Sequence, residues 1–335
     1  MEEILEYTLF FLTSLLLTLK IIPIFIKKMI KAGLTGIDVN KIEKPDVPEM
    51  GGLGVVIAFS LSLSFSVGIM KLYDSFDSFP SLVLISVLCM AALIGIMDDI
   101  SLLARKEKAW LIAFSSLPLI ISQIGSDDID LIFFKVSFTD YYSNLFFWLI
   151  VVPFGVTCCA NAINMSAGYN GLESGQMAII TFFIFIISTV NEVGTHFVLI
   201  SCSMLGSQLA LFYYNKFPAK TFVGDVGTLS FGSLFASFVI MTNQIVFGII
   251  CILPSFYELF ATIKYKIKGV ERRHSCMNPV ISDDRKISVP AGSEDYTLAF
   301  KLLSFRPMTE VKLVNSMLLL YVVSGFISLL IALVF

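Results

Sequence analysis

Charged residues are scarce in this chain, and their scarcity excludes an ordinary soluble protein. Asp, Glu, Lys and Arg make up 15% of the 335 residues, and 56% of the residues are hydrophobic. A soluble domain carries roughly 25% charged residues. The mean hydropathy of +0.86 and the division of the apolar residues into runs of about twenty therefore indicate a polytopic helical membrane protein.

Several sequence signatures are missing as well. The six cysteines form no Cys-x-x-Cys pair and no plausible zinc set, so we expect them to pack as small apolar side chains. Neither a P-loop nor a Rossmann glycine pattern occurs. No internal repeat is visible, and the interiors of the apolar runs hold very little charge. These two absences make a transporter or channel only a distant alternative.

The apolar runs predict an all-α fold of about ten transmembrane helices in a single domain, residues 1–335. The first run follows three acids and is too long for a signal peptide, so we expect it to be retained. The segment 129–139 alternates partly and predicts a small β-hairpin on the outer side. The expected spans are 4–26, 51–72, 80–97, 109–124, 144–160, 175–190, 195–214, 228–242, 244–263 and 313–335.

The basic residues gather in alternate loops. With both termini outside the cytoplasm, the inward loops hold 20 of the 23 Lys and Arg residues. The positive-inside rule therefore predicts a protein integral to the cell membrane, with both termini outside and the polar loops at the cytoplasmic face. Those inward loops are 27–50, 98–108, 161–174, 215–227 and 264–312.

Two adjacent acids, Asp98 and Asp99, end the third expected span at the inward boundary. Partly desolvated carboxylates that repel each other gain from a divalent cation or a shared proton. A solvated helix end is the alternative interpretation. Lys108 follows nine residues after Asp99. It could bind a phosphate as a point charge or anchor the helix at the membrane interface.

Two further inward loops carry amides, glycines and one acid. The loop 161–175 holds three Asn residues and no base, so its backbone N–H groups can surround a polar ligand and its amide oxygens can ligate Mg²⁺. In the loop 222–232, Asp225 lies between two glycines. A carboxylate in such a turn suits a metal whose other ligands are phosphate oxygens. Each pattern alone also fits an ordinary turn.

Taken together, the order and spacing of these motifs resemble the polyprenyl-phosphate N-acetylhexosamine-1-phosphate transferase superfamily, of the glycosyltransferase 4 type. The most specific pieces are Asn-Ala-Ile-Asn-Met-Ser-Ala-Gly-Tyr-Asn-Gly-Leu-Glu from Asn161 and Phe-Val-Gly-Asp ending at Asp225. The stretch Ala-Gly-Tyr-Asn-Gly ending at Gly171 is similar to the dolichyl-phosphate N-acetylglucosaminephosphotransferases. The short segment 264–312 points to an archaeal member. Ser275 departs from the expected motif, which has a further Arg after Arg273-His274.

The resemblance implies that Asn164 and Asp225 hold Mg²⁺, with Mn²⁺ as the alternative metal, and that Asp98, Asp99 and Lys108 are catalytic. Asn170 is expected to contact the uracil, and Arg273 a phosphate. The full set of expected substrate-binding residues is Lys44, Glu49, Asn161, Asn170, Gly171, Arg273 and His274.

The implied reaction transfers N-acetylglucosamine-1-phosphate (GlcNAc-1-phosphate) from UDP-GlcNAc to a polyprenyl or dolichyl phosphate and releases UMP. It would be the first membrane step in building a lipid-linked oligosaccharide for N-glycosylation. The alternative is a sister transferase that uses another UDP-N-acetylhexosamine for a cell-wall precursor. The expected partners are the UDP-sugar, the lipid phosphate, membrane lipids and a second copy in a homodimer, and no nucleic acid.

Overall fold

The computed structural model describes residues 2–73, 76–101, 103–132, 134–268, 279–293 and 296–335. It confirms the all-α polytopic architecture, since eight of the described helices are long and apolar enough to cross a membrane. They are α1 (Glu2–Ala32), α2 (Gly51–Tyr73), α3 (Phe79–Ser101), the continuous helix Tyr141–Met165, α8 (Leu172–Val190), α9 (Thr195–Asn215), α10 (Gly224–Met241) and α15 (Glu310–Val334). The helix Tyr141–Met165 consists of α6 (Tyr141–Phe146), the π-helical turn η1 (Phe147–Val151) and α7 (Val152–Met165).

Two of the ten expected spans differ from simple helices. The span at 244–263 is a bent pair, α11 (Ile245–Cys251) and α12 (Leu253–Ile267), with an angle of 72° between them. The span at 109–124 is two shorter helices, α4 (Arg105–Phe114) and α5 (Leu117–Ser122). Between them Ser115 and Ser116 donate their hydroxyls to the carbonyls of Ile112 and Ala113, at 2.7 and 2.6 Å. The break coincides with Pro118, the second residue of α5, which has no N–H to donate to the carbonyl of Phe114 at the end of α4.

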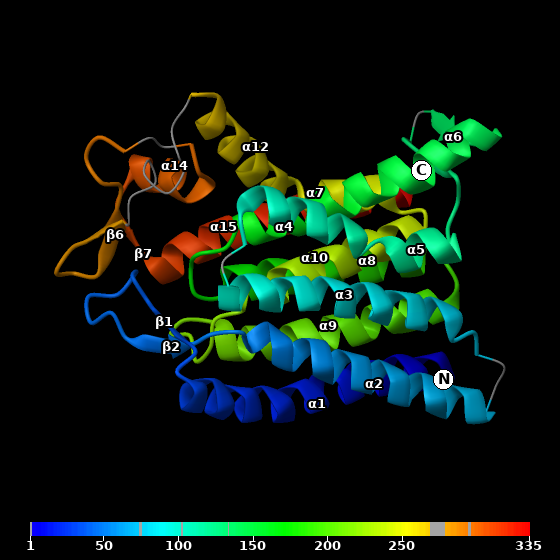
Figure 1. The fold of residues 1–335 in the computed structure, drawn as a ribbon, viewed down its shortest axis with the longest axis horizontal. Coiled ribbons are helices and arrows are strands. Elements are labelled where there is room, and N and C mark those ends of the chain that lie inside the picture. Colours follow the sequence, from blue (N-terminus) through cyan, green and yellow to red (C-terminus); the bar gives the residue numbers. More distant parts are fainter. Residues whose placement is uncertain (1, 74–75, 102, 133, 269–278, 294–295) are drawn as a thin grey trace.

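The two ends of the bundle differ in character (Figure 1). One end carries the two termini and the expected hairpin, in which β3 (Asp128–Asp130) pairs antiparallel with β4 (Lys135–Ser137). The other end carries the C-terminal end of α3, the N-terminal end of α10 and the remaining small sheets. The candidate catalytic residues therefore lie at the end of the bundle opposite to the termini.

The small sheets at this polar end are built from short strands. β1 (Thr35–Ile37) pairs with β2 (Asp46–Pro48), and β6 (Lys286–Ser288) lies between β5 (Val280–Ile281) and β7 (Met308–Thr309). Helix α14 (Leu298–Phe305) packs on the second sheet and on the start of α15 through Leu303, Met308 and Leu313. The two small sheets and α14 therefore lie over the polar end of the bundle.

Helix α10 occupies the centre of the bundle, because 89% of its apolar window is buried. Close packing at two glycines brings its first turn against α2 and α3. A Cβ on Gly52 would lie 2.2 Å from Cα of Gly227, and one on Gly95 would lie 2.4 Å from Cα of Val226. No side chain fits at either position. These contacts bring Asp225, next to Val226, beside the last turn of α3.

Candidate active site

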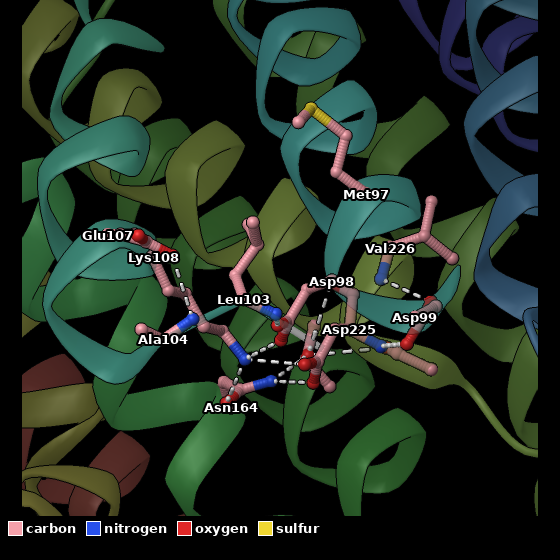
Figure 2. A network of polar contacts seen from close by, with 12 residues as sticks. Met97, Asp98, Asp99, Leu103, Ala104, Glu107, Lys108, Asn164, Asp225 and Val226 are labelled. Carbon is pink, nitrogen blue, oxygen red and sulfur yellow. Dashed lines mark hydrogen bonds and ion pairs between the residues drawn. The ribbon is translucent and has the colours of Figure 1, made fainter. Parts of the chain in front are cut away.

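Four predicted site residues, one each from α3, α4, α7 and α10, meet in a single cluster (Figure 2). Lys108 places its Nζ 2.7 Å from Asp98 Oδ2, 2.5 Å from Asp225 Oδ2 and 3.3 Å from Asn164 Oδ1. Asn164 in turn donates its Nδ2 to Asp225 Oδ1 at 2.5 Å. The sequence placed these side chains in three separate inward loops, and the fold brings the other three within hydrogen-bonding distance of Lys108.

The side chain of Lys108 is mostly buried at the start of α4, and the first turn of that helix is capped. Its side chain is only 14% exposed, and the carboxylate of Glu107 accepts a hydrogen bond from the backbone N–H of Ala104 at 3.0 Å, which closes the first turn of α4. Burial lowers the pKa of Lys108, but the carboxylates of Asp225 and Asp98 more than compensate and raise it above its ordinary value. The side chain is therefore a cation at neutral pH and not a base.

Asp98 has both carboxylate oxygens engaged within the protein. Its Oδ1 accepts from the backbone N–H of Leu103 at 2.8 Å, and its Oδ2 pairs with Lys108. The residue is 6% exposed. This arrangement ties the end of α3 to the connection that follows it, and orients the ammonium group of Lys108.

Asp99 makes different contacts from its neighbour. Its two oxygens accept from the backbone N–H groups of Asp225 and Val226, at 2.8 and 3.0 Å. These N–H groups belong to the first turn of α10, where orphan donors and the positive end of the helix dipole favour a carboxylate. Asp99 therefore fixes the start of α10 and, with it, the backbone that carries the Asp225 side chain.

We expect the Asp99→Asn variant to lose stability together with activity. An amide offers one acceptor oxygen where two donors converge, so one N–H is left unsatisfied at a cost of about 1 kcal/mol or more. The melting temperature in detergent and the turnover number check this together. A role for Asp99 as a base would instead lower turnover and leave the melting temperature unchanged.

The donor set of the cluster fits a hard divalent cation. Within the described ranges no three His, Cys, Asp or Glu side chains group around one point, but two carboxylates and the Oδ1 of Asn164 surround the ammonium of Lys108. An ammonium held by three oxygens marks a place suited to a cation. Mg²⁺ usually takes only one or two carboxylates from a protein and completes its shell with water and substrate phosphates. Asp225, Asn164 and Asp98 meet that requirement.

A pocket of about 340 Å³ leads away from this cluster. Asp225 and Thr228 lie at its lining, and Thr228 Oγ1 accepts from Asn164 Nδ2 at 2.7 Å. Asn170, the residue expected to contact a uracil, lines the same pocket and is 5% exposed. A volume of this size accommodates part of a small polar ligand. Asp225, predicted to bind a metal, and Asn170, predicted to contact the nucleobase, therefore line one cavity.

A second polar network borders this pocket around Asn170, and sequence reasoning missed its other members. Lys41 Nζ pairs with Asp38 Oδ2 at 2.9 Å and also with Glu310 Oε2. Glu310 Oε1 accepts from the backbone N–H of Asn170, and Asp38 Oδ2 accepts from Asn170 Nδ2, both at 2.9 Å. Asn40 Nδ2 donates to the carbonyl of Gly168 at 2.8 Å. The loop before α2 and the start of α15 thus hold the amide loop in place.

The sequence offered one signal for these residues. Glu310 is an acid immediately before the last apolar run, and Asp38, Asn40 and Lys41 lie in the same inward loop as the predicted Lys44. A buried acid next to an apolar run needs a partner, so an ion pair between Glu310 and a lysine such as Lys41 could have been proposed from the sequence. The contact of Glu310 with Asn170 depends on tertiary structure.

The remaining predicted substrate-binding residues lie at the edge of the site or outside it. Lys44 is exposed and lies beyond the lining of the 340 Å³ pocket, and Asn161 donates its Nδ2 to the carbonyl of Thr157 on its own helix at 2.9 Å. Glu49 is half-buried over Gly36, close enough to Asp99 to influence it electrostatically. Arg273 and His274 fall outside the described residues.

Gly171 has a structural role beside the pocket. It caps α8 with φ +88°, a left-handed conformation that favours glycine, and its N–H donates to Asn215 Oδ1 at 3.2 Å. A Cβ at this position would also meet Cα of Lys216 at 3.1 Å. Gly171 thereby sets the direction in which the preceding Asn170 enters the pocket.

Comparison with known proteins is consistent with this site. Residues 81–243, which contain the whole Asp98–Lys108–Asn164–Asp225 cluster, match the model of glycosyl transferase family 4. A protein of Methanocaldococcus jannaschii, provisionally named a glycosyltransferase, is 30% identical over 308 residues, which cover 92% of this chain and 91% of the relative.

Two other relatives carry more specific names. A Sulfolobus acidocaldarius protein, provisionally named UDP-N-acetylglucosamine–dolichyl-phosphate N-acetylglucosaminephosphotransferase, is 33% identical over 248 residues, 72% of each chain. The phospho-N-acetylmuramoyl-pentapeptide-transferase of Enterococcus hirae is 29% identical over 253 residues, which cover 71% of this chain and 75% of the relative.

Proposed function

Because the chain belongs to glycosyl transferase family 4, we propose that it transfers GlcNAc-1-phosphate from UDP-GlcNAc to a polyprenyl phosphate of the dolichol type and releases UMP. At the coarser level, its relatives identify it as a membrane-bound polyprenyl-phosphate hexosamine-1-phosphate transferase. The observation that carries the proposal is the junction of the cationic and carboxylate cluster with the pocket that Asn170 and Asp225 share.

The reaction is a displacement at phosphorus. An oxygen of the lipid phosphate forms a bond to the β-phosphorus of UDP-GlcNAc while the bond from that phosphorus to the UMP oxygen breaks. Transfer of this kind needs mainly alignment and neutralisation of charge. The ammonium of Lys108 supplies a fixed positive charge within the cluster, and Asp98 and Asn164 hold it in position.

A general base contributes little to this step. A phosphate monoester has a second pKa of about 6, so the attacking oxygen is already largely ionised near neutral pH. Both carboxylate oxygens of Asp98 already have partners in the protein, the backbone N–H of Leu103 and the ammonium of Lys108. We therefore assign Asp98 to orienting Lys108, in preference to removing a proton from the acceptor.

We propose that Asp225 and Asn164, supported by Asp98, hold Mg²⁺ together with the diphosphate, with Mn²⁺ as a substitute. A bound divalent cation supplies charge neutralisation at the diphosphate oxygens. Within the protein, Asp99 keeps the backbone of Asp225 in place, and Thr228 orients the amide of Asn164. We also propose that this end of the bundle faces the cytoplasm, since the loops assigned to it hold 20 of the 23 basic residues.

A panel of UDP-sugars tests the proposed activity directly. The purified protein in detergent is incubated with one polyprenyl phosphate, MgCl₂ and each of UDP-GlcNAc, UDP-N-acetylgalactosamine and UDP-N-acetylmuramoyl-pentapeptide, and UMP release is measured. We expect release that depends on the lipid phosphate and is fastest with UDP-GlcNAc. Faster release from the muramoyl substrate would favour the sister reaction instead, and no release with any donor would contradict the proposed function.

A further inference from the structure

The side chain of Asn170 is held at the wall of the pocket by one specific partner. Its Nδ2 donates to Asp38 Oδ2 at 2.9 Å, and its backbone N–H donates to Glu310 Oε1, also at 2.9 Å. Asp38 and Asn170 are 4% and 5% exposed. Both the backbone and the amide group of Asn170 are therefore fixed by acids that come from other parts of the chain.

The chemistry of Asp38 decides which way the amide of Asn170 points. Lys41 lies 2.9 Å from Asp38 Oδ2, and an ionised carboxylate can only accept hydrogen bonds. The Asn170 atom that faces Asp38 must then be the nitrogen, because a half-turn of the amide would set its oxygen against a carboxylate oxygen. The ion pair with Lys41 and the short contact from Lys41 to Glu310 keep Asp38 in place.

The oxygen of Asn170 is consequently left as the free end of the amide. Among the described residues no hydrogen-bond donor reaches Asn170 Oδ1, and the residue lines the same pocket as Asp225. The proposed function puts the diphosphate at Asp225, which leaves the part of the same pocket beside Asn170 for the nucleobase of the donor. The nucleobase then faces the Oδ1 of Asn170, an acceptor. The Nδ2 of Asn170 cannot take its place, because it is bound to Asp38.

We propose that Asp38 makes the site selective for uracil over cytosine by locking Asn170 with its amide oxygen towards the base. Uracil carries a donor at N3–H, which an amide oxygen accepts. Cytosine carries a lone pair at N3, which the same oxygen repels. The inference rests on the proposed function, because it takes the donor to be a nucleoside diphosphate sugar, and it adds a residue that acts through Asn170 to set base selectivity.

Nucleotide competition in the purified full-length protein tests this. UDP, CDP and N3-methyl-UDP compete with UDP-GlcNAc, and the inhibition constant of each is measured for the wild type, Asp38→Ala and Asp38→Asn. A buried group left without its partner predicts that the wild type prefers UDP over CDP by about 10- to 100-fold. N3-methyl-UDP, which lacks the donor, is expected to bind the wild type as weakly as CDP.

The two variants separate the locking role from a role in folding. In Asp38→Ala the amide of Asn170 is free to rotate, and Lys41 keeps Glu310 as its partner, so the preference should fall to within a few-fold. Asp38→Asn keeps the side-chain size and accepts either orientation of Asn170, so its preference should fall in the same direction. Glu43→Gln is the matched control, since Glu43 is an exposed acid of the same loop that pairs with Arg285 at 2.8 Å.

Each outcome bears on one claim. An unchanged UDP-to-CDP ratio in both Asp38 variants, or equal affinity of the wild type for UDP and N3-methyl-UDP, overturns the locking of Asn170. An equal loss of selectivity in Glu43→Gln overturns it as well. Absence of UMP release from any UDP-sugar by the wild type would overturn the proposed function, whereas release without base selectivity overturns only this inference.

Discussion

The Asp225→Asn variant should lose transferase activity by about 10³-fold or more. Asp225 is the residue on which Lys108 Nζ and Asn164 Nδ2 both converge, at 2.5 Å each. Exchanging one oxygen for NH₂ removes the negative charge that pairs with Lys108 and one of the two carboxylates available to a cation. Losses of preorganised charge at a reacting phosphate or oxyanion commonly cost 10²- to 10³-fold each, and loss of a metal ligand adds to that.

Two measurements accompany this prediction. Rates of UMP release are determined over a range of MgCl₂ concentrations, and the half-saturating concentration should rise in Asp225→Asn. The melting temperature in detergent should change little, because the backbone N–H of residue 225 keeps its bond to Asp99. Asp284→Asn is the control, since Asp284 is an exposed acid whose partners among the described residues are its neighbours Ser282 and Lys286. Activity of Asp225→Asn close to that of the wild type would contradict the assignment.

Lys108→Met should reduce turnover by about 10²- to 10³-fold while strengthening the binding of a divalent cation. The ammonium of Lys108 lies among Asp98, Asp225 and Asn164, the oxygens assigned to the cation. Lysine and cation therefore compete for the same carboxylates in the absence of substrate. Removing the ammonium leaves the buried carboxylate of Asp98 beside the partly buried one of Asp225, which destabilises the protein and favours a cation in its place.

The dependence of the melting temperature on Mg²⁺ separates the two effects. Because ligands stabilise the state that they bind, MgCl₂ should raise the melting temperature of Lys108→Met more than that of the wild type. Lys286→Met, at an exposed lysine paired with Asp284, provides the matched control and should behave as the wild type. An equal or smaller Mg²⁺-induced shift in Lys108→Met would show that lysine and cation do not share these oxygens.

Most of the fold followed from hydropathy alone. The spans expected at 51–72, 195–214 and 313–335 lie within three residues of α2, α9 and α15, because long apolar runs must satisfy their backbone as helices in lipid. The segment 109–124 was the exception. Hydropathy counts apolar side chains and does not register that Pro118 lacks the N–H that would continue the helix beyond Phe114.

The cluster at Asp98, Lys108, Asn164 and Asp225 could be proposed from sequence because all four residues fall in segments that the charge distribution predicts on one side of the membrane. The different roles of Asp98 and Asp99 could not. Neighbouring residues on a helix point in directions about 100° apart, so one carboxylate meets Lys108 and the other meets the start of α10. Only the packing of α3 on α10 decides that Asp98 meets Lys108 and that Asp99 meets α10.

The second network was hidden for a similar reason. Asp38 and Lys41 are far from Glu310 in the sequence and come together only because the loop before α2 lies against the start of α15. Lys44, which sequence reasoning favoured, lies three residues further along the loop and is exposed. In this loop, tertiary packing places Lys41, and not Lys44, in the ion-pair network beside the pocket.

Anomalous diffraction from crystals of the protein grown with MnCl₂ and UDP tests the central claim most directly. The account predicts one strong manganese peak in contact with Asp225 and Asn164, with the uracil beside Asn170 in the same pocket. A manganese peak elsewhere in the protein, or UDP bound away from the pocket between Asn170 and Asp225, would contradict it.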